Sequence, residues 1–371
     1  MKPSAGFSHL QIFFIFTVKS ISYKFTQIAL TEIDTDDRLT DFLFAGGRSL
    51  PREGICSRRA ALSDSSSNIF RPTTPDSLND SIEAIGVIHP VVLMKSADRW
   101  KIICGHRRVN LCKTLGLADI PARVTESGLD DETLLALNLT ENRSHRLYSD
   151  VEKGRIIDKL LGAGVSGEII IQKYMPILGL QRSKKLYQEF SRVSSLETGL
   201  QTLLHELNVP LRIFAPLLQW SGVDKNSAET LFSSVRPGIN KWRELLELAE
   251  EIARIENTSP GDIFRREAIQ SILAQNDLQA HEKYDRIVQT MTSWRYPVLT
   301  HLRKKIARAQ DQLSLGPRTR IRIQESFETE EIKIEIKGRD QKSLVDEVKK
   351  LANATESPAM EELLRILREL K

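Results

Sequence analysis

The chain has 371 residues, of which 27% are charged and 40% hydrophobic, a balance typical of a folded, water-soluble protein of two to four domains. Its formal net charge is only +4, so any surface that binds nucleic acid must be local rather than spread over the whole molecule. The three cysteines, Cys56, Cys104 and Cys112, form no CxxC pair, which supports neither a disulfide framework nor a zinc site and favours a reducing cytoplasm.

The N-terminus carries an apolar run, LQIFFIFTV, at residues 10–18. The run is about nine residues long, whereas a membrane-spanning helix needs roughly 20. The stretch that follows, VKSISYKF, offers no small-residue cleavage site for a signal peptide. We therefore expect residues 1–24 to be a tail, a first strand or a non-native extension, and we expect no membrane partner.

Residues 25–147 predict one compact α+β domain. The expected order is a strand at 25–33, a long loop rich in Gly, Ser, Arg and Pro at 45–75, a helix at 78–88, the strands PVVLMK and RWKIIC, a helix after Gly105, the strand IPARV at 120–124 and an acid-started helix at 130–146. Short strands and helices that alternate in this mixed order are typical of α+β folds.

The junction between RWKIIC and the next helix carries the first candidate site. Gly105 lets a ligand approach the backbone closely, and the helix that begins there presents unpaired N–H groups and the positive end of its dipole. Arg107 and Arg108 add charge and forked donors that suit phosphate. Taken alone, this pattern is better explained by two solvated arginines.

A second cluster ends the helix at 130–146. Glu141 and Asn142 offer a carboxylate and an amide oxygen, which suit a Mg²⁺ ion that bridges phosphates. Arg146 lies one turn beyond Asn142 and could join the phosphate contacts. A phosphate cradle together with a metal-binding pair indicates a site for a nucleoside triphosphate.

Residues 78–146 resemble the N-terminal domain of the ParB family of chromosome and plasmid partition proteins. The matching stretches are SIEAIGVIHPVVL, GHRRVNLCKTLGL followed by IPARV, and ENRSHR. The resemblance implies a ParB/sulfiredoxin-like fold that binds CTP with Mg²⁺. By it, Gly105, His106, Arg107, Arg108 and Arg146 hold the triphosphate, Pro90 lies near the cytosine, and Glu141 and Asn142 position metal and water, with Glu141 as the candidate catalytic residue of a slow CTPase.

The sequence departs from the family pattern at several positions. His106 stands where the family has a glutamate, His145 stands where it has a glutamine, and the 45–75 loop is longer than expected. The same fold includes sulfiredoxin, which uses a catalytic cysteine. Aligning the glycines, however, places His106 rather than Cys104 at that cysteine, and we expect Cys104 to point into the core.

Residues 148–235 are expected to form a helix-turn-helix domain, as ParB proteins have. The first helix is placed at 169–175, the turn at PILGLQ and the second helix at 182–193. The second helix carries basic and amide side chains away from its packing face, as a helix in the major groove of double-stranded DNA does. These candidate DNA-binding residues are Arg182, Lys184, Lys185, Gln188 and Arg192.

The rest of the chain predicts a helical region at 236–314 and a ββα module at 315–371. Alternating isoleucines in RTRIRIQ and EIKIEIK predict two antiparallel strands, and the helix after them carries Leu344, Val348 and Leu351 on one face. The module is similar to the ParB C-terminal dimerisation module, which implies a homodimer. The resemblance also implies a ParA-type ATPase as a partner and a place on the nucleoid or a plasmid.

The resulting hypothesis is a cytoplasmic ParB-like protein that binds a palindromic DNA site and closes a dimeric clamp when it binds CTP. Two alternatives stay open. One is a DNA-binding regulator or plasmid protein whose nucleotide site is inactive, and the other is an enzyme of the same fold with phosphotransfer or nuclease chemistry.

Overall fold

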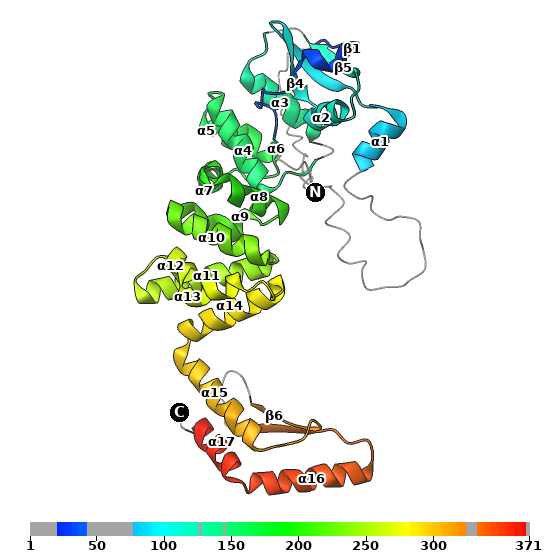
Figure 1. Ribbon diagram of the computed structural model, residues 1–371. Coiled ribbons are helices and arrows are strands. Elements are labelled where there is room, and N and C mark those ends of the chain that lie inside the picture. Colours follow the sequence, from blue (N-terminus) through cyan, green and yellow to red (C-terminus); the bar gives the residue numbers. More distant parts are fainter. Residues whose placement is uncertain (1–20, 43–76, 126–127, 144–145, 324–331, 369–371) are drawn as a thin grey trace, which may run out of the picture. The chain divides into compact units, whose positions relative to one another are not determined.

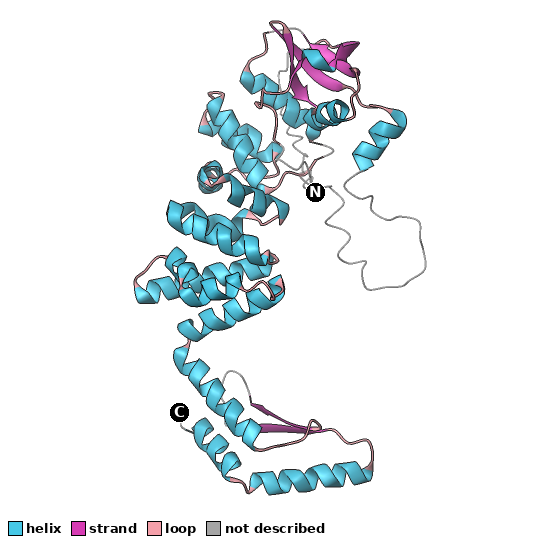
Figure 2. Cartoon of the chain, in the orientation of Figure 1, coloured by secondary structure: helices cyan, strands magenta, loops and turns pink. Residues whose placement is uncertain are grey.

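The computed structural model describes residues 21–42, 77–125, 128–143, 146–323 and 332–368 (Figure 1). The chain has mixed α/β structure with mostly helical content (Figure 2), and it divides into two compact units, Met1–Trp220 and Ser221–Lys371. Over the described ranges, no helix is both long enough and apolar enough to span a bilayer. The predictions for residues 1–20, most of the expected tail, and for the 45–75 loop lie outside the described residues.

A five-stranded mixed sheet forms the N-terminal part of the first unit, with strand order β1-β5-β3-β4-β2. Strand β3 is central, and β5 lies between β1 and β3, pairing antiparallel with β1 and parallel with β3. Strand β3 pairs antiparallel with β4, so the start of β3 lies beside the end of β4. The elements are β1 Lys24–Ala29, η1 Leu30–Glu32, β2 Ile33–Asp34, α1 Ser77–Ile85, β3 Val91–Ser96, β4 Arg99–Cys104, α2 His106–Thr114, β5 Asp119–Thr125 and α3 Asp131–Asn142.

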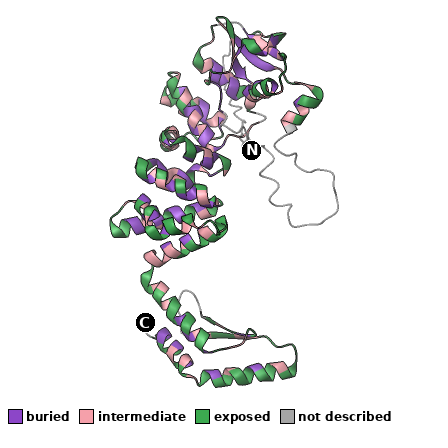
Figure 3. Ribbon diagram, in the orientation of Figure 1, coloured by how far each residue is buried: buried purple, intermediate pink, exposed green. Residues whose placement is uncertain are grey.

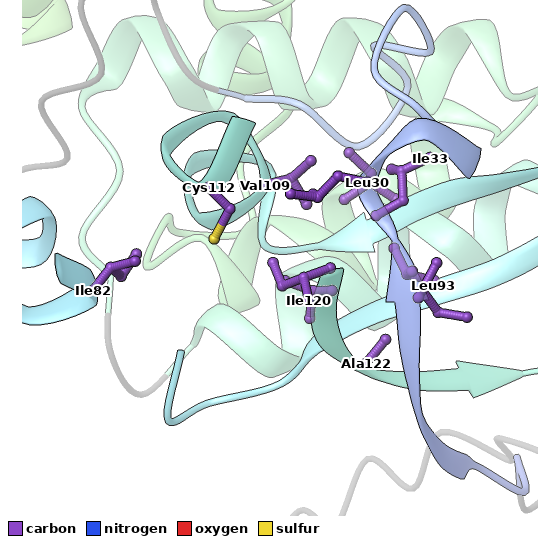
Figure 4. Close-up of a cluster of buried hydrophobic side chains, with 11 residues drawn as sticks. Leu30, Ile33, Ile82, Leu93, Val109, Cys112, Ile120 and Ala122 are labelled. Atoms are coloured by element: carbon purple, nitrogen blue, oxygen red, sulfur yellow. The ribbon is translucent and has the colours of Figure 1, made fainter. Parts of the chain in front are cut away.

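Two apolar clusters cover the two faces of this sheet. On one face, Ile82 of α1 and Val109 and Cys112 of α2 pack on strand residues such as Leu93 and Ile120 (Figure 4). On the other face, Leu134 of α3 packs on a second cluster made of Val92, Met94, Ile103 and Cys104. Alternate residues of one strand therefore contribute to opposite clusters, as the pleat of a strand requires.

The expected strand at 25–33 is wrong in its second half. The strand β1 ends at Ala29, and a 3₁₀ turn follows at Leu30–Glu32 before the short strand β2. The Leu30 backbone N–H donates to the Ala118 carbonyl at 2.9 Å, so the turn is fixed by a distant part of the chain. The other strands and helices expected between residues 78 and 146 are present, with the last helix, α3, ending at Asn142.

The second part of the first unit is helical. A complete capping box starts α4, in which Ser149 and Glu152 satisfy each other's backbone N–H groups. Gly154 of α4 packs tightly, because a Cβ there would lie 2.5 Å from Val193 Cβ. The elements are α4 Asp150–Gly162, α5 Gly167–Ile169, the π-helical turn η4 Ile170–Tyr174, α6 Met175–Ile177, α7 Lys184–Phe190, η5 Val193–Ser195, α8 Thr198–Glu206, α9 Leu211–Phe214 and η6 Ala215–Gln219.

The second unit begins with a helical bundle around three aromatic rings. Phe232 stacks on Trp242 with ring centroids 3.5 Å apart, and Phe264 meets Phe232 edge-on at 6.2 Å. All three side chains are fully buried. The helices of the unit up to residue 312 are α10 Gly222–Val235, α11 Ile239–Glu256, α12 Pro260–Arg265, α13 Glu267–Ala274, α14 Ala280–Arg295 and α15 Pro297–Gln312.

The C-terminal module has the expected two antiparallel strands and a helix, followed by one helix that the sequence analysis did not predict. The elements are β6 Thr319–Ile323, β7 Ile332–Ile336, α16 Gln341–Thr355 and the additional α17 Pro358–Arg368. Buried side chains of α17, including Leu363 and Ile366, pack against Ile306 and Ala309 of α15. The core of this module therefore includes α15, which precedes residue 315.

Candidate functional site

Gly105 sits where strand β4 turns into helix α2. Its φ of +109° lies in the left-handed region, and a Cβ at this position would lie 2.6 Å from Val91 Cγ1. Only glycine fits this junction, because Val91 is fully buried. No side chain caps the start of α2, so its first-turn N–H groups keep the geometry of an anion site. The expected strand-to-helix junction at Gly105 is thus present, and phosphate binding there stays a prediction.

His106, the residue that departs from the family pattern, is buried and has a specific partner. Its Nε2 lies 2.9 Å from Thr40 Oγ1, and the single Thr40 hydroxyl proton is donated to the Ile102 carbonyl at 2.5 Å. Thr40 must therefore accept from a protonated Nε2. Burial lowers the pKa of His106 from 6.5 to about 4, which keeps the ring neutral at physiological pH.

A chain of hydrogen bonds from asparagine side chains continues from Thr40 to the end of α3. Asn138 Nδ2 donates to the Thr40 carbonyl at 3.1 Å and to the Ile103 carbonyl at 2.6 Å. Asn142 Nδ2 then donates to Asn138 Oδ1 at 2.9 Å. Two of the three sequence stretches that carry the family resemblance, around His106 and around Asn142, are therefore joined through Thr40 and Asn138, neither of which the sequence analysis singled out.

Arg107 and Arg108 differ in their surroundings. Arg107 is half-buried and Arg108 donates from Nη1 to the carbonyls of His89 and Pro90, the latter at 3.1 Å. The structure therefore brings together Arg108 and Pro90, two residues expected at opposite ends of one nucleotide. Burial lowers the pKa of Arg108, and the charges of Glu141 and Arg123 act on it as well.

Glu141 is partnered by a residue that the sequence analysis missed. Arg123, on the interior strand β5, forms an ion pair with the Glu141 carboxylate through Nη2. The only sequence signal for Arg123 is that it interrupts the apolar strand IPARV. Across the described ranges, no three His, Cys, Asp or Glu side chains converge as a metal site.

Arg146 has its partners in the helical part of the unit. Its Nη2 forms an ion pair with Glu152 of α4, whose side chain is fully buried, and its guanidinium lies over the Tyr148 ring at 4.8 Å. A role of Arg146 at the nucleotide phosphates stays a prediction. The neighbouring His145 lies outside the described residues.

Cys104 ends strand β4 and points into the core, as expected. The thiol is 2% exposed, and burial raises its pKa to about 12, with a further contribution from the Glu141 carboxylate. A thiolate nucleophile is therefore disfavoured at this position. This argues against chemistry of the sulfiredoxin type.

The region expected to bind DNA has a helix, a turn and a second helix. A continuous helical stretch runs from Gly167 to Ile177, Gly179 takes a φ of +73° in the turn, and α7 follows with Ser183 as its N-cap. Phe190 at the end of α7 is buried. The predicted DNA-binding residues are all exposed; they are Arg182, Lys184, Lys185, Gln188 and Arg192.

Comparison with known proteins identifies the N-terminal region. The family model of the ParB N-terminal domain matches residues 63–143. The chain is 27% identical over 104 residues to the probable chromosome 1-partitioning protein ParB of Deinococcus radiodurans, covering 28% of this chain and 35% of that protein. It is 24% identical over 213 residues to stage 0 sporulation protein J of Bacillus subtilis, covering 56% of this chain and 68% of that protein.

Among solved structures, C-terminally truncated ParB from Caulobacter crescentus, complexed with CTP-gamma-S, is 16% identical and covers 53% of this chain and 98% of that chain with a TM-score of 0.20. A TM-score this low supports no comparison of individual residues, so the sequence matches carry the assignment. The match to the Deinococcus protein spans about a third of that protein's length. The comparisons therefore show that residues 63–143 match the ParB N-terminal domain and that this part of the chain is similar to chromosome-partitioning proteins.

Proposed function

We propose that this chain is a partition protein that binds double-stranded DNA through α7 and a cytidine nucleotide at the start of α2. The observation that carries the proposal is the junction at Gly105, where an uncapped helix start lies in a ParB N-terminal domain. The hydrogen bonds that run from His106 through Thr40 and Asn138 to Asn142 support it. They connect two of the stretches that resemble the ParB family.

In the proposed site, the nucleotide phosphates meet the first-turn N–H groups of α2 and the guanidinium of Arg107. Arg108 fixes the His89–Pro90 backbone, which the family resemblance places near the base. The side chain of Arg108 therefore connects the segment proposed to lie near the base with the helix proposed to bind the phosphates. The choice of CTP over other nucleotides rests on the family alone.

The residues present fit phosphate better than they fit a magnesium ion. The Glu141 carboxylate is paired with Arg123. The bonds of Asn142 to Asn138 use its amide nitrogen and do not involve the oxygen that a metal would bind, so it is the pairing of Glu141 that disfavours the metal. A Mg²⁺ ion would have to displace a guanidinium from its carboxylate ligand. We therefore derive no hydrolytic step through a metal or through Glu141.

Equilibrium binding of labelled CTP, ATP and GTP tests the nucleotide part of the proposal. We expect selective CTP binding that falls by at least about tenfold in Arg108→Ala, because the variant releases the backbone beside the base. Arg99→Ala is the matched control, since Arg99 is an exposed arginine at the opposite end of β4. Binding of DNA without any binding of nucleotide would contradict the switch.

The exposed basic side chains of α7 are proposed to read a palindromic DNA site. Base contacts from such a helix specify the sequence, whereas contacts to phosphates position the protein. Arg182 Nε donates to the Gln172 carbonyl at 3.1 Å, which ties the start of this surface to the preceding helix. The surface is therefore held on a packed scaffold rather than on a free loop.

Replacing Lys184 and Lys185 together with alanine should weaken DNA binding and its salt dependence. Each phosphate contact contributes about 0.9 to the slope of log K against log salt, so the double variant should lose up to roughly 2 from that slope. Lys24→Ala with Lys95→Ala removes the same charge from exposed positions of β1 and β3 and should leave the slope unchanged. An unaltered slope in the α7 variant would exclude this surface.

The proposed dimer would form through the C-terminal module. Helix α16 is largely exposed (Figure 3), and this exposure includes Leu344 at 43%, Val345 at 44% and Val348 at 49%. An apolar face with this exposure indicates an interface, and a two-fold homodimer is the commonest way to cover one.

Closure of paired N-terminal domains as a clamp and a ParA-type partner ATPase belong to the same proposal. Sedimentation as a monomer would contradict the dimer.

A DNA-binding regulator without a nucleotide switch is the second candidate. It is favoured by one specific observation, namely that Arg108 and Glu141 both have partners within the chain. The nucleotide-binding experiment separates the two candidates directly.

A further inference from the structure

Arg123 occupies an unusual place for a charged side chain. It lies on β5, an interior strand of the sheet, opposite Phe25 of β1 on one side and Val92 of β3 on the other. Its neighbours Ile120 and Ala122 belong to the cluster on one face, so Arg123 projects toward the opposite face, which α3 covers. Its side chain is only 27% exposed, and a partly buried arginine is unfavourable unless it is paired.

The Arg123 guanidinium is held from two directions. The Glu141 carboxylate accepts from Nη2, and the Tyr23 ring lies under the guanidinium with its centroid 5.6 Å from Cζ. A planar guanidinium between a carboxylate and an aromatic face loses little further freedom when it binds a ligand. Its five N–H donors are not exhausted by one carboxylate contact.

The position of Arg123 relative to the Gly105 junction follows from the strand register. The end of β4 lies beside the start of β3, and Val92 near that start is the β5 partner of Arg123. Glu141, Arg123 and Arg108 also interact electrostatically with one another and with Cys104. The start of α2, Arg108, Arg123 and the Glu141 carboxylate therefore lie near the same end of the strands. Arg123 and Glu141 form an ion pair there.

A divalent cation would be disfavoured at this carboxylate, because it would have to approach a fixed positive charge at ion-pair distance. A triphosphate has the opposite preference, since arginine binds phosphate oxygens through parallel N–H bonds. We propose that the Arg123 guanidinium supplies, at the nucleotide phosphates, the positive charge that a metal ion would otherwise bring, so that this site binds its nucleotide without a divalent cation. This inference rests on the proposed nucleotide-binding function.

The test is equilibrium binding of labelled CTP to the full chain in Mg²⁺ and in EDTA. We expect dissociation constants that agree within about threefold in the two conditions. In Arg123→Gln, binding in EDTA should fall by at least about tenfold, and part of the affinity should return with Mg²⁺, because Glu141 is then released. Arg99→Gln is the control for loss of one positive charge from β4, a different strand of the same sheet.

A second variant keeps the proposal falsifiable if Arg123→Gln does not fold. Glu141→Gln should bind CTP in EDTA as well as the unaltered chain or better, because the variant frees the guanidinium. Loss of CTP binding by the unaltered chain in EDTA alone would overturn this inference and leave the proposed function intact. Absence of CTP binding in both conditions would overturn the proposed function and this inference with it.

Discussion

Gly105→Ala is expected to lower the free energy of unfolding of the first unit by roughly 2–4 kcal/mol, the sum of a strained backbone and an overpacked core. The backbone term arises because an L-residue rarely adopts the φ of +109° found here. The packing term arises because the added methyl group would lie 2.6 Å from Val91 Cγ1, and Val91 is fully buried with no space to move. Denaturant unfolding measures the change, with the signal of Trp100 in β4 reporting on this sheet.

Gly116→Ala is the matched control for this effect. Gly116 also has a positive φ, +69°, but nothing lies within 4 Å of the position that its Cβ would take. The control should therefore show only the backbone term, about 1 kcal/mol. If the two variants were equally destabilised, close packing at the Gly105 junction would not be what selects glycine. CTP binding by Gly105→Ala at temperatures where the variant is folded should also be weaker, because α2 must then shift away from Val91.

The local features of the site could be predicted from sequence because they depend on neighbouring residues. The spacing of Val109 and Cys112, three residues apart, predicts that both lie on the buried face of α2. Gly105 predicts where this helix begins. The amphipathic spacing of Met360, Leu363 and Ile366 also predicts a helix, so α17 could have been found by the same reasoning.

The partners of the polar side chains could not be predicted, because they depend on contacts between distant segments. His106 meets Thr40 from 66 residues away, and Arg123 meets Glu141 from 18 residues away. Nothing in a single sequence distinguishes a solvated arginine from one paired across a sheet. The ion pair of Arg146 with Glu152 could not be predicted either, since the spacing of Arg146 from Asn142 gave no sign of Glu152 as a partner.

His106 also leads to a prediction about pH. Burial holds its pKa at about 4 in the folded chain, against 6.5 when it is exposed, so the unfolded state binds more protons between these two pH values. The free energy of unfolding must then fall as the pH falls from about 6.5 toward 4, and the contribution of this one ring is roughly 3 kcal/mol. Above about pH 6.5 both states are neutral at this position, and the contribution does not change with pH.

His106→Gln isolates this contribution from those of the carboxylates, which also titrate at low pH. A glutamine amide can still donate to Thr40 Oγ1 but does not titrate, so the variant should lose much less stability than the unaltered chain between pH 6.5 and 4. His89→Gln, which replaces an exposed histidine of the same domain, should keep the pH dependence of the unaltered chain. Equal slopes for the His106 variant and the unaltered chain would mean that the ring is protonated in the folded state. The protonated ring would still donate from Nε2 to Thr40 Oγ1, so the hydrogen bonds that link α2 to α3 would be kept, and burial would not be what sets the charge of His106.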